Sequence, residues 1–555
     1  MPDSSDSSGT GPTRRELIGG AAAATVAGGL TGAGTEGLAR ASEGKPRLSK
    51  ADFEGKNLVI FITDQERGLQ HFPANWARRN LPGLRRLTKH GVSFTRAYTN
   101  ACMCTPARST LLSGYFPAQT GCNFTLEDDM PAERYPQVEL RPDFPNIGTV
   151  MAAAGYNVVY KGKWHLSKPV SSTAPRRTLE PYGFSRWDPP DAGANQDVSE
   201  AGGGTVDNDG RYMNSVGDYR TGDEGVLQYI GETARLQQPF CLIVSLVNPH
   251  DVLLWPKTWD EAGYTRDWLT GEIDLPPTVA EDLAKKPRVQ EQFLRLFNVT
   301  GELPTDRKKR RYVNFYANLM KSSDAYLAEV LNALQRNGLR RDTVIIRTAD
   351  HGEMGLAHGG LRQKNFNMYE EATRVPLIVS NPRLYPEAES CDHLVSHVDF
   401  LPTLASLFGA PESARADWQG VDYSRSILDP EKAAAPQDYL LFTFEDYQSG
   451  QASPPYPSPP NHLVGLRERN WKIVRYYDIE GTQPDEWELY DLRNDPLEKH
   501  NLAFDPSRMS AGDKREFKRL KKKLAAKSEE RLQPLPSTPQ PLTPPSNRGT
   551  IPIRD

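Results

Sequence analysis

The sequence has few cysteines and no long apolar run. Five cysteines in 555 residues are too few for the disulfide framework that holds small secreted domains together. No stretch of 18 or more strongly apolar residues occurs, so we expect no stable membrane span. Neither sign of charge is in large excess, with 67 Lys and Arg against 71 Asp and Glu. Because the chain has no global positive field, we expect no nucleic-acid partner.

The first 41 residues predict an export signal. Arg14 and Arg15 precede an Ala- and Gly-rich stretch that reaches about Gly34, and the A-x-A pattern at residues 39–41 offers a cleavage site. The alternative is a disordered N-terminus with a chance Arg pair. The order of the three regions favours a twin-arginine signal peptide. We therefore predict that the twin-arginine export machinery carries the folded protein to the periplasm, the surface or the exterior of a bacterium.

Short β-branched runs alternate with helical stretches over most of the chain. Helical segments such as residues 310–337 separate the runs, and most runs are apolar on both faces. The runs cover residues 58–63, 156–160, 240–246, 343–347 and 376–380. This pattern predicts an α/β fold with a large, mostly parallel sheet sandwiched by helices. We assign it to a domain of residues 50–435, in which ligands should gather at the carboxyl ends of the strands.

The pattern changes after about residue 436. Residues 439–444 and 471–477 read as strands and residues 514–532 as a basic helix, which predicts a smaller α+β domain with an antiparallel sheet over residues 436–532. Residues 533–555 are rich in Pro, Ser and Thr and predict an extended tail without a core of its own.

Three stretches resemble insertions rather than framework. Residues 171–223 are rich in Gly, Asp, Pro and Asn, residues 255–306 are polar and charged, and residues 447–462 match no chemical pattern. We expect these loops to line a substrate cleft.

The most specific local pattern is C-T-P-A-R at residues 104–108. Alone, this short pattern would favour a buried structural cysteine. Two predicted strands, however, end in oxygen-rich pairs, Asp64 with Gln65 and Asp350 with His351. An Asp after a strand usually caps a turn or helix. Two carboxylates and a carboxamide delivered from neighbouring strand ends would instead suit a hard divalent cation, which prefers several oxygen ligands.

Cationic and imidazole side chains follow other predicted strands. Lys163 and His165 stand two residues apart in K-G-K-W-H-L, so they share a face of an extended segment. Asn248 and His250 follow the run at residues 240–246, and Lys364 lies in R-Q-K. A lone Lys or His in a loop is most often only solvated. The occurrence of all these segments in one chain favours a shared site.

In this order the segments resemble the sulfatase family of the alkaline phosphatase superfamily, over about residues 57–502. The resemblance implies a sulfuric ester hydrolase whose nucleophile is formylglycine (3-oxoalanine), made from Cys104 by a formylglycine-generating enzyme. It implies a small-molecule or saccharide sulfate ester as substrate. It also implies one divalent metal, with Ca²⁺ as the family default and Mn²⁺ or Mg²⁺ as alternatives. The metal ligands would be Asp64, Gln65, Cys104, Asp350 and His351.

The two metal-ligand pairs depart from the commonest family pattern. Many arylsulfatases have Asp-Asp and Asp-Asn where this chain has Asp64-Gln65 and Asp350-His351. Both variants resemble the choline-sulfatase and phosphonate-monoester-hydrolase branch. An imidazole ligand also suits manganese or another transition ion better than calcium.

The resemblance further implies a division of labour. The hydrated formylglycine would attack sulfur with Asp350 as candidate base, and proton transfer to His165 would then release sulfate. Arg108 would hold the hydrated aldehyde on a helix that starts at Pro106, and His250 would protonate the departing alkoxide. Lys163 and Lys364 would offset the charge of the transferring group. The substrate-binding residues would be Lys163, His250, Lys364 and Asn248.

Three alternatives stay open. The same nucleophile could serve a phosphonate monoester or phosphodiester hydrolase. The chain could be an exported binding protein in which Cys104 stays unmodified. Cys102 and Cys104 could belong to a zinc site, although their spacing is one residue short of C-x₂-C.

Overall fold

The structure is a computed structural model that describes residues 48–541 except 129, 132, 172, 196, 236–237 and 452–453. The predicted signal peptide, residues 1–41, and residues 542–555 of the predicted tail lie outside the described residues. Within the described part of the chain, no helix has both the length and the apolar character needed to cross a bilayer.

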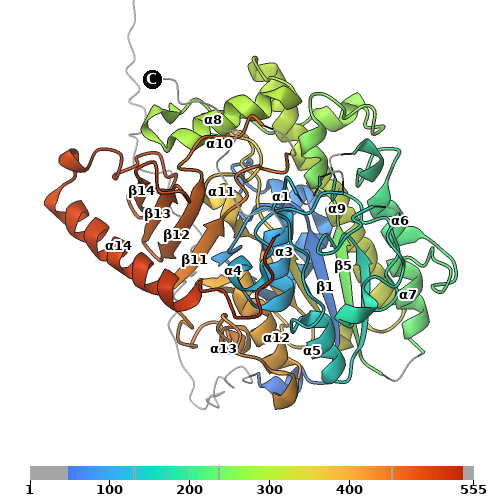
Figure 1. Ribbon diagram of the computed structural model, residues 1–555. Coiled ribbons are helices and arrows are strands. Elements are labelled where there is room, and N and C mark those ends of the chain that lie inside the picture. The colour runs from blue at the N-terminus through green and yellow to red at the C-terminus, as the bar shows by residue number, and fades with distance from the viewer. Residues whose placement is uncertain are drawn as a thin grey trace, which may run out of the picture. The chain divides into compact units, whose positions relative to one another are not determined.

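A seven-stranded sheet forms the centre of the α/β domain (Figure 1). In spatial order its strands are β4 (Asn157–Gly162), β5 (Phe240–Leu246), β1 (Asn57–Thr63), β6 (Thr343–Ala349), β8 (Leu377–Ser380), β2 (Gly91–Phe94) and β9 (Glu389–Cys391). The pairs β4·β5, β5·β1 and β1·β6 are parallel, whereas β8 runs antiparallel to both β6 and β2. All five predicted strands are present, and the predicted α/β class with a mostly parallel sheet is confirmed.

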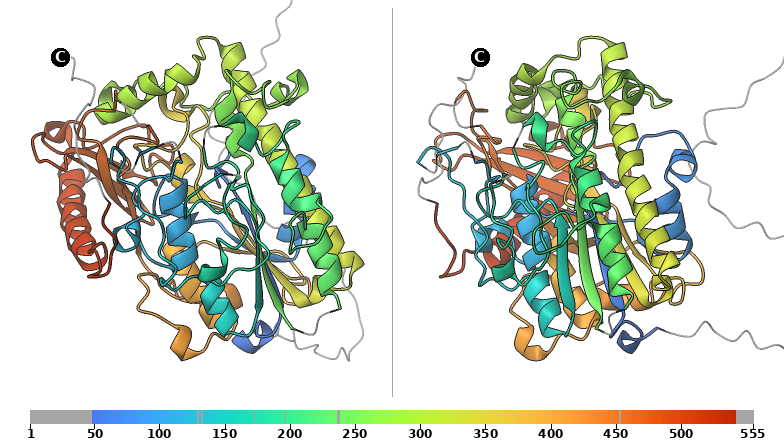
Figure 2. Two further views of the ribbon diagram at one scale, coloured as in Figure 1. Left: turned by 45° about the vertical axis from the view of Figure 1, so that its right-hand side comes forward. Right: turned by 90° about the vertical axis from the view of Figure 1, so that its right-hand side faces the viewer.

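Helices cover both faces of the sheet, as Figure 2 shows. One face carries α3 (Cys104–Ser113), α5 (Ile147–Ala153) and α12 (Phe400–Leu407), and the other carries α2 (Pro82–Lys89), α7 (Val226–Thr233) and α9 (Asp306–Arg336). Leu58, Ile60 and Ile62 of β1 pack against the first group, while Val59 and Phe61 pack against the second. Because side chains alternate along a strand, β1 is apolar on both faces.

Shorter elements complete the domain. A three-stranded sheet contains β10 (Val395–Ser396), β3 (Ala97–Tyr98) and β7 (Arg374–Val375). The remaining α-helices before the C-terminal sheet are α1 (Trp76–Asn80), α4 (Pro117–Thr120), α6 (Asn208–Asn214), α8 (Arg288–Phe297), α10 (Ala357–Gly360), α11 (Glu370–Thr373) and α13 (Ser424–Leu428).

A separate antiparallel sheet follows near the C-terminus, next to helix α14 (Ala511–Arg531). Its strands are β11 (Tyr439–Phe444), β12 (His462–Glu468), β13 (Trp471–Tyr477) and β14 (Glu486–Asp491), in that order. This confirms the predicted C-terminal α+β region. Phe442 and Val474 of this sheet share a buried cluster with Met103 and Phe366 of the α/β domain, so a common core joins the two regions.

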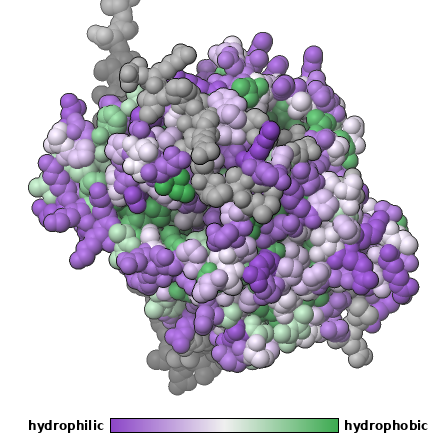
Figure 3. All heavy atoms as spheres, viewed as in Figure 1, coloured by the Kyte–Doolittle hydropathy of each residue, from purple (hydrophilic) through white to green (hydrophobic). Residues whose placement is uncertain are grey.

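The described part of the predicted tail contacts the α/β domain. The Gln119 carboxamide donates to the Gln533 carbonyl at 2.8 Å, the Thr538 hydroxyl donates to the Gln119 carbonyl at 2.8 Å, and Leu535 packs against the main core. All five cysteines are buried and free. The face in Figure 3 is mostly hydrophilic, with hydrophobic residues in small groups.

Candidate active site

The site lies at the carboxyl ends of four neighbouring parallel strands. Asp64 follows β1 and Asp350 follows β6, and these strands are paired up to their last residues, Thr63 and Ala349. The segments after β4 and β5, on the other side of β1, supply Lys163 and His250. The strand order therefore gathers at one edge residues that are up to 286 positions apart in the chain (64 to 350).

Cys104 is the first residue of α3 and is 3% exposed. The helix therefore starts two residues earlier than the predicted start at Pro106. Pro106 still lies in the first turn, where its missing N–H has no helical acceptor to lose. The free N–H groups of this turn give the Cys104 end of α3 a partial positive charge that favours an anion.

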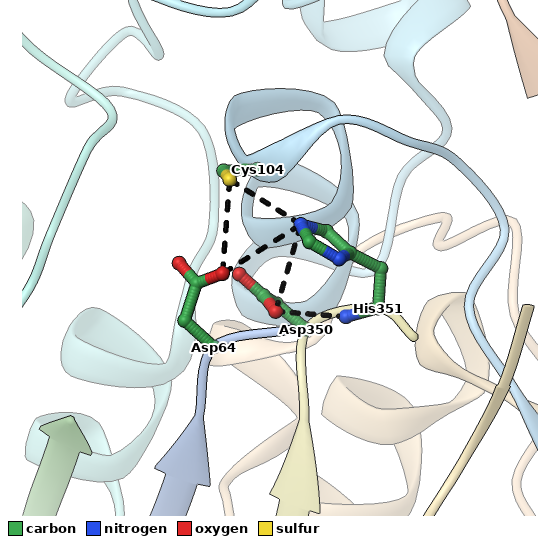
Figure 4. Close-up of side chains that lie close together, drawn as sticks. All are labelled: Asp64, Cys104, Asp350 and His351. Carbon is green, nitrogen blue, oxygen red and sulfur yellow. Dashed lines mark hydrogen bonds and ion pairs between the residues drawn. The ribbon is translucent and has the colours of Figure 1, made fainter. Parts of the chain in front are cut away.

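Four side chains converge on a candidate metal site (Figure 4). One potential ligand atom from each of Asp64, Cys104, Asp350 and His351 lies within 4.8 Å of the other three. The His351 Nε2 atom is 3.3 Å from the Cys104 Sγ atom, 3.8 Å from Asp64 Oδ1 and 3.7 Å from Asp350 Oδ1. Two buried carboxylates and an imidazole around one point fit a divalent cation. Cys102 is not part of this group, so the spacing-based zinc hypothesis finds no support.

Arg108 ties the two carboxylates together. Its guanidinium donates to Asp350 Oδ2 at 3.0 Å and to Asp64 Oδ2 at 3.1 Å, and it also donates to the Ser245 hydroxyl at 2.9 Å. Lys163 Nζ lies 2.7 Å from Asp64 Oδ2. These contacts occupy the Oδ2 atoms and leave both Oδ1 atoms on the side of His351.

Gln65 lies beside this four-residue cluster. Its carboxamide oxygen accepts a hydrogen bond from Lys364 Nζ at 2.8 Å, and its Nε2 atom donates to Glu353 at 2.6 Å. The Gln65 backbone N–H donates to Asp350 Oδ1 at 3.0 Å. In this arrangement the predicted ligand Gln65 positions Lys364 and Asp350.

A cavity of about 200 Å³ opens next to Cys104. Four of the predicted site residues line it, namely Cys104, His165, His250 and Lys364. Asn248, predicted to bind substrate, does not line the cavity. Its carboxamide instead lies 3.2 Å from the Tyr264 hydroxyl. All three predicted loops contribute to the wall, through Ala194, Phe293 and Ser449 among others.

The charges around Cys104 favour anionic groups. Burial opposes ionisation of the Cys104 thiol, but Lys163 and Lys364 outweigh it and hold the pKa of this thiol well below its usual range. Burial likewise opposes ionisation of Asp64, yet Lys163, His250 and Arg108 hold the pKa of this carboxyl below its usual range. Burial, followed by Lys163, lowers the pKa of His250 to about 4.

Several supporting residues carry no sequence signal that we recognised. The buried Asp191 carboxylate accepts the backbone N–H groups of Trp164 and His165, both at 2.7 Å, and so fixes the K-W-H segment. Glu353 fixes Gln65, as described above. Glu127 lines the cavity from a loop that no motif marked. Only Glu353 lay close to a motif, three residues after Asp350.

Comparisons with known proteins agree with this geometry. A family model described as Sulfatase matches residues 56–410, well over half of the chain, and a second, described as N-sulphoglucosamine sulphohydrolase, C-terminal, matches residues 358–530. The chain is 28% identical over 469 residues to a choline-sulfatase of Rhizobium meliloti, covering 81% of this chain and 83% of that protein. It is 26% identical over 428 residues to a Delta 4,5-hexuronate-2-O-sulfatase of Bacteroides thetaiotaomicron, covering 76% and 79%.

A solved structure extends the comparison to the fold. The phosphonate monoester hydrolase of Agrobacterium radiobacter superposes with a TM-score of 0.57 at 21% identity, covering 85% of this chain and 96% of that one. At this identity the likeness concerns the fold. The family match, which spans the strand ends and Cys104, carries the assignment. The chain belongs to the sulfatase family, whose members are sulfuric ester hydrolases.

Proposed function

We propose that this chain hydrolyses a sulfate ester to an alcohol and sulfate, with a nucleophile formed from Cys104. The observation that carries the proposal is the position of Cys104. It starts α3, lies 3.3 Å from His351 in a candidate metal cluster, and lines a cavity together with Lys364 and His250. A residue placed in this way can reach an anionic group that the surrounding cations hold.

Two groups would complete the site. A divalent cation held by Asp64, Asp350 and His351, with residue 104 as a further ligand, would supply positive charge next to the transferring group, and formylglycine at position 104 would supply a hydroxyl nucleophile. We propose Ca²⁺ as the cation, with Mn²⁺ or Mg²⁺ as alternatives. The buried carboxylate oxygens fit all three ions, and the imidazole favours manganese.

The chain's own cations would bind and orient the sulfate. Lys364 lines the cavity, and Lys163 is fully buried behind it against Asp64. Together with the N-terminus of α3 they place positive charge on the side where negative charge develops. Arg108 holds Asp64 and Asp350 at a fixed separation, so the cluster keeps its shape when the substrate enters.

His165 is arranged to accept a proton. Its Nε2 atom lies 2.7 Å from the Leu126 carbonyl oxygen, which can only accept, so Nε2 carries the hydrogen. In the neutral ring Nδ1 is then the free base, and this atom is buried with no hydrogen-bond partner among the described residues. This tautomer suits the base that we propose for the release of sulfate.

His250 is arranged to give up a proton. Burial and Lys163 lower the pKa of His250 to about 4, which makes its protonated form a stronger acid than free imidazole. The negative charge of a bound sulfate ester would raise this pKa and favour protonation. We therefore propose that His250 protonates the departing alkoxide, and that His250, Lys163 and Lys364 bind the sulfate.

Mass spectrometry of the peptide that spans Cys104 tests the nucleophile. Protein from a host that carries a formylglycine-generating enzyme should show the mass change from thiol to aldehyde and should hydrolyse 4-nitrophenyl sulfate. Chelation should abolish this turnover, and Ca²⁺ or Mn²⁺ should restore it. An unmodified thiol in protein from the native host would reject the proposal in favour of a binding protein.

The phosphonate monoester hydrolase fold match gives the second candidate function. Parallel assays with a nitrophenyl sulfate, a phosphate diester and a phosphonate monoester separate the two. A higher kcat/KM for the phosphorus esters would replace sulfate as the main substrate.

The sequence analysis also leads us to propose export. Passage through the twin-arginine pathway and cleavage after Ala41 would place the enzyme outside the cytoplasm. Because this pathway exports folded proteins, Cys104 would be converted to formylglycine in the cytoplasm before export. Substitution of Arg14 and Arg15 by Lys should retain the protein in the cytoplasm, as fractionation of the host would show.

A further inference from the structure

Glu127 connects the active-site cavity to a second, larger space. It lines the cavity of about 200 Å³ next to Cys104 and also a neighbouring cavity of about 750 Å³. Among the described residues, Gln451 also lines both. An alcohol that extends from a sulfate at residue 104 toward the larger cavity would therefore pass Glu127.

The backbone around Glu127 is held firmly. Its N–H donates to Gln137 Oε1 at 2.9 Å, and its carbonyl accepts from Lys168 Nζ at 2.8 Å. The preceding residue, Leu126, donates its N–H to the Thr105 hydroxyl at 3.0 Å and accepts from His165. These contacts tie Glu127 to the residue after Cys104 and to the proposed base, so its position relative to the reacting group is fixed before substrate binds.

The Glu127 carboxylate, in contrast, has no partner in the part of the chain that the structure describes. The residue is only 8% exposed, yet its side chain makes no hydrogen bond or ion pair with any described residue. The other carboxylates of the larger cavity are engaged. Asp128 accepts from the Val170 N–H, Asp197 caps a short helix, and Glu200 accepts from the N–H groups of residues 194 and 195.

A buried carboxylate without a partner is costly unless something else supplies one. The described residues around Glu127 do not supply a partner. Burial and the nearby Asp446 disfavour the charged carboxylate and raise the pKa of Glu127 well above its usual value. A ligand with a positive charge would donate a hydrogen bond to the Glu127 carboxylate and would offset its repulsion from Asp446. Phe293 and Phe297 also line the smaller cavity, and such aromatic rings suit the apolar carbons of a ligand and an ammonium group.

We propose that Glu127 selects sulfate esters whose alcohol part carries a positively charged amino group. This inference rests on the proposed sulfatase function and adds the substrate class. The sulfate would bind at the lysines and the ammonium group would pair with Glu127. An alcohol with a carboxylate or a second sulfate would place like charge against Glu127 and would be rejected.

Three small esters of similar size test the inference: 2-aminoethyl sulfate, propyl sulfate and 2-carboxyethyl sulfate. Protein with formylglycine confirmed by mass spectrometry should show a kcat/KM roughly 10- to 100-fold higher for the amine than for the propyl ester, because a hydrogen bond between charged groups is stronger than one between neutral groups. The carboxyl ester should fall below the propyl ester. Glu127→Gln should reduce the preference for the amine to less than about threefold, and Glu127→Asp should retain part of it.

Asp197→Asn is the matched control. Asn caps a helix as well as Asp does, so the substitution removes a charge from the larger cavity without removing the cap. It should leave the preference within about twofold, since this carboxylate is already engaged. Circular dichroism and the Tm would show that each variant folds.

The outcomes separate the two proposals. Turnover without a preference for the amine, or a preference that survives Glu127→Gln in folded protein, would overturn the role of Glu127 and leave the sulfatase proposal standing. Failure of modified protein to hydrolyse any sulfate ester, 4-nitrophenyl sulfate included, would reject the proposed function and the selection with it.

Discussion

The two ends of the substrate region carry opposite charge. At the Cys104 end, Arg108, Lys163 and Lys364 lie around the candidate metal cluster. At the other end, the cavity of about 750 Å³ has four carboxylates in its wall and no lysine or arginine among its described lining residues. One end attracts an anion and the other repels it, so a bound ester would have one preferred direction.

The two ends are also built differently. Most of the cationic end consists of residues at strand ends and in the first turns of α3, whose positions the buried sheet fixes, while Lys364 lies between α10 and α11. The acidic end comes from loops between residues 127 and 200 and near residue 450. The sheet can therefore keep the chemistry constant while the loops change the substrate.

Removal of the nucleophile should have the largest effect. We expect Cys104→Ala to lower kcat/KM for 4-nitrophenyl sulfate by at least about 10³-fold, because the other residues of the site then act on a substrate with nothing to attack it. Cys122→Ala is the control, since Cys122 is equally buried but lies in the main core. Comparable losses in both variants would show that Cys104 matters only for folding.

Arg108 tests whether the cationic end is held together by charge. Its guanidinium is 2% exposed and bridges two carboxylates that are not exposed at all. We expect Arg108→Gln to lower the free energy of unfolding by about 3–5 kcal/mol in chelator-treated protein, because two buried anions lose their common partner. Urea denaturation measures this loss.

The control for Arg108 is Arg177→Gln, which removes an exposed pair with Glu180 and should leave stability unchanged. If the two variants have the same free energy of unfolding, Asp64 and Asp350 must become protonated in Arg108→Gln without a loss of stability.

The cationic end could largely be predicted from the sequence. Strands that are apolar on both faces identify a parallel sheet, and residues just after such strands meet at one edge, which placed Asp64, Asp350, Lys163 and His250 in one site. Asn248 was less predictable. It occupies the expected loop, but the direction of its side chain depends on Tyr264, 16 residues away.

The acidic end could not be predicted in this way. Glu127 follows no strand and belongs to no periodic pattern, and its place beside Cys104 depends on hydrogen bonds to Gln137 and Lys168. Such contacts link loops through single side chains, so residue spacing carries no trace of them. The start of α3 at Cys104 was missed for a related reason, because proline is tolerated throughout the first turn.

Lys364 tests how much of the catalytic effect at the cationic end is electrostatic. It lines the cavity, and Gln65 and Gln363 hold its Nζ atom at 2.8 and 3.3 Å. We expect Lys364→Ala to lower kcat/KM about 10²-fold, the usual cost of removing one donor to developing negative charge. Lys364→Arg should recover part of the loss. A change in KM alone would indicate that Lys364 binds the ground state and the transition state equally.

Glu200 tests the acidic end through stability instead of turnover. Burial raises the pKa of Glu200 to about 7, although hydrogen bonds from Asn195 oppose the shift. A carboxyl whose pKa is higher in the folded state stabilises the fold at low pH and loses this contribution as pH rises from about 4.5 to about 7. We expect the free energy of unfolding to fall by an amount on the order of 2 kcal/mol over this window, and Glu200→Gln to remove that slope.

Asp197→Asn provides the comparison for Glu200, because hydrogen bonds from Ser199 lower the pKa of Asp197 and its contribution is lost only below that window. Urea denaturation of the three proteins at pH 4.5, 6 and 7.5 measures the slopes. If Glu200→Gln keeps the wild-type slope, another buried carboxyl, such as Asp251 with a pKa raised by burial to about 6, carries it. The loop that Glu200 holds would then tolerate a charged carboxylate at neutral pH, and Glu200 would be ionised when the ester enters.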